Sequence, residues 1–100
     1  MYFLVRSRVT GPLELSSAKK VLAALESPNL KVICHFGFLS EPGGVQIVEA
    51  EGLEELREYL SKFQDVNAST EIVPLMTHEE TVGVLKRYIK KLEVEKPRFV

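Results

Sequence analysis

Four side chains on two apolar segments could bind or activate a small molecule. His35 lies within an apolar run, and Tyr2, Arg6 and Arg8 occupy alternate positions of a second segment, residues 2–9. A histidine titrates near neutral pH and can act as a general base, and a guanidinium binds anions. Gathered in one cavity, these residues would bind a small anionic or phenolic ligand. The more common alternative is structural, with His35 hydrogen-bonded in an interface and the arginines paired with Glu49 or Glu71.

The other reactive side chains form no recognisable motif. Cys34 is adjacent to His35, but successive residues of a strand point to opposite faces, so the two cannot form a nucleophile–base pair. The separation of His78 from His35 fits no metal signature. The pair Gly43-Gly44 lacks the helix and the lysine that follow in a phosphate-binding loop. We therefore expect neither a metal nor a cofactor.

Charge and composition narrow the classes of partner. The chain has 13 basic and 14 acidic residues, whereas nucleic-acid binders usually carry a basic excess. The apolar residues 1–5 are followed by Arg6 and are too few for a signal peptide or a membrane span. A single cysteine fits a reducing compartment, and abundant Glu and Lys are typical of thermophilic proteins. We expect a cytoplasmic protein without nucleic-acid or membrane partners.

The spacing of apolar residues predicts seven elements. These are strands over residues 2–9, 30–39, 45–50 and 68–76, and helices over residues 16–26, 52–63 and 78–92. Ser16 or Ser17 can cap the first helix, and Thr77 with Glu80 forms a capping box before the third. Residues 1–93 are expected to form one domain, followed by an extended tail over residues 94–100.

The order βαββαβ followed by one helix predicts an α+β, ferredoxin-like fold. Right-handed crossovers place the first two helices on one face of a sheet with strand order 4-1-3-2, and Pro74 fits the edge position of the fourth strand. The other face keeps apolar residues such as Leu4, Ile33 and Leu39. Because monomers rarely expose so much apolar surface, we expect a homodimer packed sheet to sheet, with a possible contribution from the last helix.

This arrangement leads to an expectation for the candidate site. If the Cys34 face of the second strand meets the helices, His35 lies on the opposite face. Arg6, Arg8 and Tyr2 would then share that face with His35, inside a cavity of the dimer.

The second half of the chain also resembles a known group. The segments Val45–Ala50 and Glu71–Thr77, with Leu53 and Leu56 between them, look like a family of small dimeric α+β barrel proteins without an assigned function. At the level of fold, that family is similar to the muconolactone-isomerase, antibiotic-biosynthesis-monooxygenase and stress-response barrel groups. The resemblance implies a dimeric barrel but no catalytic residues.

Two functions remain open at the level of sequence. The first is a homodimeric ligand-binding or regulatory domain without catalysis. The second is a small cofactor-independent enzyme of isomerase or monooxygenase type that uses His35 and Arg6 in the barrel cavity. The first is favoured because no converging catalytic set is visible.

Overall fold

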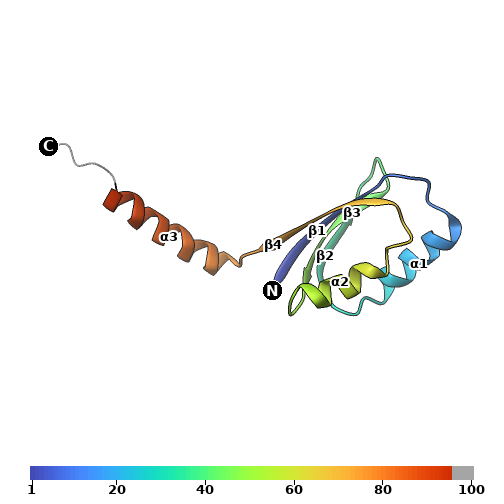
Figure 1. Cartoon of the computed structure of the whole chain (residues 1–100), viewed down its shortest axis with the longest axis horizontal. Helices are drawn as coiled ribbons and strands as arrows, with labels where there is room; N and C mark the ends of the chain where they lie inside the picture. The colour runs from blue at the N-terminus through green and yellow to red at the C-terminus, as the bar shows by residue number, and fades with distance from the viewer. Residues whose placement is uncertain (96–100) are drawn as a thin grey trace.

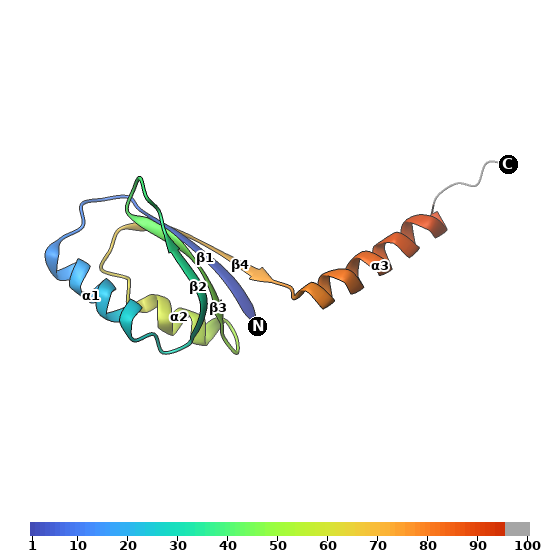
Figure 2. The same cartoon turned by 180° about the vertical axis from the view of Figure 1, so that it is seen from behind.

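The computed structural model describes residues 1–95 and has the predicted order of elements. The elements are β1 (Tyr2–Val9), α1 (Leu15–Glu26), β2 (Lys31–Gly37), β3 (Gly43–Glu49), α2 (Leu53–Ser61), β4 (Ala68–Leu75) and α3 (His78–Glu95). Helices α1 and α2 lie on the same side of the sheet, whereas α3 leads away from it (Figures 1 and 2). The chain therefore has the predicted ferredoxin-like fold with an extra C-terminal helix.

The four strands form one antiparallel sheet in the order β2-β3-β1-β4. This order confirms the one predicted from the crossovers. Strand β4 is an edge, and its Pro74 lies opposite Phe3 of β1. A proline is tolerated there because an edge strand needs hydrogen bonds on one side only.

The hydrophobic core lies between the central strands and α2. Phe3 of β1 and Val48 of β3 are fully buried, as are Leu56 and Tyr59 of α2. The rings of Tyr59 and Phe63 add an edge-to-face contact with centroids 5.3 Å apart. Helix α2 forms here because residues three and four apart share one apolar face, while its first turn is acidic.

The predicted helix ends are partly confirmed. Helix α1 begins at Leu15, and its N-cap residue Glu14 makes no side-chain capping bond, so the prediction of a serine cap is wrong. The capping box of α3 is present: the amide of Glu80 donates to Thr77 Oγ1 and the amide of Thr77 donates to Glu80 Oε1, each at 3.1 Å. Helix α3 continues to Glu95, so residues 94 and 95 are helical. The rest of the predicted tail, residues 96–100, lies outside the described residues.

A β-bulge in β2 decides which of its side chains face the helices. Val32 pairs with Val48, and Cys34 pairs with the adjacent Ile47, so Ile33 is an extra residue in the strand. An extra residue reverses the alternation of every side chain that follows it. His35 consequently lies on the helix-facing side of the sheet and Cys34 on the other side, which makes the predicted facing of both residues wrong.

We call the sheet surface opposite α1 and α2 the open face. The strand registers place on it a set of largely apolar side chains and several charged ones. The apolar members include Leu4, Cys34, Phe36, Val45, Ile47, Val73 and Leu75.

Candidate ligand-binding site

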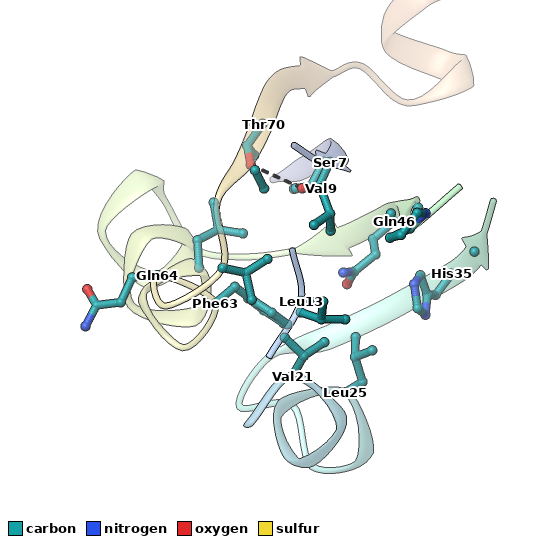
Figure 3. A pocket seen from close by; sticks show the side chains of 18 of the residues that line it. Ser7, Val9, Leu13, Val21, Leu25, His35, Gln46, Phe63, Gln64 and Thr70 are labelled. Carbon is teal, nitrogen blue, oxygen red and sulfur yellow. Dashed lines mark hydrogen bonds between the residues drawn. The ribbon is translucent and has the colours of Figure 1, made fainter. Parts of the chain in front are cut away.

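A cavity of about 670 Å³ lies between the sheet and the two helices (Figure 3). This volume is within the range of small-molecule sites in proteins. Val21 and Leu25 of α1 form one wall, and Val5 and Val9 of β1 belong to the opposite one. Phe63, which follows α2, closes part of the cavity on the side nearer the core.

The cavity exists because α1 does not pack closely against the sheet. Ala24 is the one buried residue of α1, whereas Val21 and Leu25, which lie about one helical turn apart, are half-buried and border the cavity instead. The part of the sheet that borders the cavity carries small residues, including Gly37, Gly43 and Gly44. At Gly44, a Cβ atom would lie 2.6 Å from the carbonyl oxygen of Phe36, so this position has no room for a side chain.

Polar groups enter the cavity at a few positions. His35 and Gln46 are cross-strand neighbours on β2 and β3, and Figure 3 shows their side chains side by side. Ser7 Oγ and Thr70 Oγ1 are 3.2 Å apart and hydrogen-bond to each other between β1 and β4. No charged side chain is found among the described residues that line the cavity.

The orientation of Gln46 is set by the core. The hydroxyl of Tyr59 donates a 2.7 Å hydrogen bond to Gln46 Oε1. Burial raises the pKa of Tyr59 above 10.0, so the phenol keeps its proton and acts as the donor at neutral pH. Because Oε1 accepts from Tyr59, the amide nitrogen of Gln46 remains to donate to a ligand.

The structure separates the four predicted site residues. His35 lines the cavity, but Tyr2, Arg6 and Arg8 follow the opposite alternation to Val5 and lie on the open face. Arg8 Nε pairs with Glu41 Oε1 of the β2–β3 loop at 3.1 Å, and Arg6 lies across from Glu71 in the β4 register. The expected grouping of His35 with the arginines is therefore wrong. Ligand binding by any of the four stays a prediction.

The loss of this grouping also affects the enzyme hypothesis. Arg6 and His35 are on opposite sides of one sheet, so they cannot act on the same substrate within a single copy. His78 is the first residue of α3 and does not line the cavity. Within residues 1–95, no cluster of three or more His, Cys, Asp or Glu could hold a metal ion. No helix in that range has the length and apolar character needed to cross a membrane.

Sequence reasoning did not find Gln46, Ser7 or Thr70. All three lie on strands, and their facing depends on pairing registers that alternation alone leaves open. The one available signal was indirect: Ser7 alternates with the apolar Val5 and Val9, so these three side chains belong to one face of β1.

The fold and the cavity define a small α+β domain with an internal pocket, and the sequence places it in a family. Residues 1–89 match the family described as Domain of unknown function (DUF3303), and the chain belongs to that family. No protein with a curated description matches the chain.

Two solved structures show limited similarity. Protein Atu4242 from Agrobacterium tumefaciens is 16% identical, with 78% of this chain and 96% of that chain covered and a TM-score of 0.44. A chain of the MjSpt4:Spt5 complex is 28% identical, with 85% of this chain and 58% of that chain covered and a TM-score of 0.38. At these TM-scores neither similarity bears on function.

Proposed function

We propose that this protein binds a neutral, largely apolar small molecule in the cavity between the sheet and helices α1 and α2. The observation that carries the proposal is the lining of the cavity: its walls are mostly aliphatic, and its polar groups are hydroxyls, amides and one imidazole. Apolar walls supply affinity, and a few placed polar groups supply orientation.

The described residues that line the cavity carry no charged side chain, which favours a neutral ligand over an anionic one. An anion in an apolar cavity loses its hydration and needs a cation in compensation. The candidate cations Arg6 and Arg8 are on the other side of the sheet. A phenol or a related hydroxylated aromatic compound fits better, since its ring can lie among Val21, Leu25 and Phe63.

The polar end of such a ligand would lie beside His35 and Gln46. The amide nitrogen of Gln46 can donate to a ligand oxygen, and a neutral imidazole can accept the ligand's proton in a hydrogen bond. His35 is exposed, so it sits where the cavity meets solvent. The apolar part of the ligand would then extend inward, towards Phe63.

A neutral fluorescent probe, N-phenyl-1-naphthylamine, provides the first test. We expect its emission to rise on binding, with saturation at micromolar protein. Ala68→Phe places a ring in the cavity from β4 and should weaken binding at least tenfold. Phe36→Ser changes the open face instead and serves as the matched control. Loss of binding in Phe36→Ser with no effect of Ala68→Phe would contradict the proposal.

The two histidines allow a second comparison. Phenols should displace the probe from the parent protein, and His35→Ala should weaken that displacement by about tenfold, the worth of one hydrogen bond of about 1.4 kcal/mol. His78→Ala is the matched control because His78 does not line the cavity. Equal displacement from both variants would exclude His35 from the site.

A further inference from the structure

We infer that α3 docks on the open face of a second copy of this chain, in a reciprocal exchange that closes both apolar surfaces. This inference concerns the side of the sheet away from the cavity and does not depend on the proposed ligand. It starts from the isolation of α3. Among the described residues of this 18-residue helix none is buried, and α3 extends away from the body of the protein (Figures 1 and 2).

The dimensions of the chain show how far α3 departs from a compact fold. The radius of gyration is 18.9 Å, and the longest axis is 70 Å. A compact chain of 100 residues has a radius of gyration of about 13 Å. A helix that packs against nothing is marginal in water, because most helical stability in proteins comes from burial of an apolar face.

Helix α3 has such a face. Leu85, Tyr88, Ile89 and Leu92 recur at helical spacing, and each is between 47% and 56% exposed. We call these four residues the α3 stripe. Thr77 and Glu80 cap the helix start, so the sequence specifies a helix at this position. Within residues 1–95, nothing buries the apolar side of this helix.

The open face is the matching surface. Leu4 and Ile47 lie at its centre on β1 and β3, and Phe36 on β2 is 67% exposed. Helices α1 and α2 cover the other side of the sheet, so one apolar layer is still missing. The described part of the chain thus carries one uncovered sheet face and one unpacked amphipathic helix.

The connection between β4 and α3 favours a partner chain over self-closure. Only Met76 and Thr77 separate the end of β4 from the start of α3, and the helix continues away from the sheet edge. Covering its own sheet would require the chain to reverse within these two residues. A second copy related by a two-fold axis needs no reversal, because each helix reaches the other copy's sheet.

The sizes of the two surfaces agree. An 18-residue helix is about 27 Å long, and an 8-residue antiparallel strand has about the same length. With a width of about 10 Å, each helix covers roughly 270 Å² of sheet. Counted on both surfaces and for both contacts, the exchange buries roughly 1,100 Å² or more, close to the range of stable interfaces.

Light scattering on the full chain tests the inference. The parent should have about twice the 11.3 kDa mass of one chain. Leu85→Glu/Ile89→Glu should raise the dimer dissociation constant at least about 100-fold, since it places two charges in an apolar contact. Arg87→Glu changes the net charge by the same amount on the opposite side of the helix, and should remain dimeric.

The open face gives an independent variant. Ile47→Glu should also produce monomers, because it charges the surface on which α3 docks. Circular dichroism of both variants should retain the signal of the folded body, since neither replaces a residue of the core. A dimer that survives Leu85→Glu/Ile89→Glu but not Ile47→Glu would overturn the exchange and support sheet-to-sheet packing. A monomeric parent would overturn it outright.

Discussion

Removal of the Tyr59 hydroxyl should lower the free energy of unfolding by about 1 kcal/mol. Tyr59 is fully buried, and its hydroxyl donates to Gln46 Oε1 at 2.7 Å. A hydrogen bond of this kind contributes about 0.5–1.5 kcal/mol net, and a buried acceptor without its donor costs about 1–3 kcal/mol. Gln46 is half-buried at the cavity wall, where water can replace the lost donor, so the loss should be near 1 kcal/mol. The ring contact with Phe63 is kept in Tyr59→Phe.

Urea unfolding of a double-mutant cycle isolates this bond. The four proteins are the parent, Tyr59→Phe, Gln46→Leu and the double variant, and the expected coupling energy is about 0.5–1.5 kcal/mol. A coupling energy indistinguishable from zero would refute the reasoning that the core fixes the orientation of Gln46.

Three further predictions concern stability, each measured by urea unfolding. Burial raises the pKa of Tyr59 above 10.0, so the unfolded chain loses its phenol proton at a lower pH than the folded chain does. The contribution of Tyr59 to the free energy of unfolding is therefore complete below pH 10 and declines as the pH rises above it. This decline should be absent from Tyr59→Phe. Leu56→Ala should cost about 2–5 kcal/mol because Leu56 is fully buried, whereas Leu53→Ala, at a side chain 51% exposed, should change stability by less than about 1 kcal/mol. Gly43→Ala should cost about 1–3 kcal/mol or more, since φ is +136° and a Cβ would lie 2.3 Å from a backbone oxygen of β1; the same change at Gly37, where the nearest atom is 3.8 Å away, should cost less.

The fold was largely predictable because its signals are local and agree with one another. Alternation in β1, the capping box at Thr77 and Glu80, and the position of Pro74 each indicate a feature that the structure confirms. The crossover rule then fixes the order of the strands without any knowledge of side-chain contacts.

The facing of β2 was not predictable from alternation. Strict alternation places Val32, Cys34 and Phe36 on one apolar face, and that face would be expected to meet the helices. The bulge at Ile33 depends on how β2 pairs with β3, and no local signal marks it. This single residue moved His35 away from the arginines and into the cavity.

The cavity itself also lay beyond sequence reasoning. The stripe of α1 that includes Val21 and Leu25 is typical of a helix packed against a core, and the sequence does not show the distance at which that helix stands from the sheet. The small residues at this end of the sheet, including Gly44, leave the space between the sheet and α1 unfilled.

The most direct test of ligand binding is a nuclear magnetic resonance experiment on the methyl-labelled protein with bound N-phenyl-1-naphthylamine. If the cavity is the site, intermolecular nuclear Overhauser effects should connect the probe with the methyl groups of Val21, Leu25 and Val9, which line it. Overhauser effects confined to Ile47 and Val73 on the open face would contradict the proposal, because they would place the probe on the other side of the sheet.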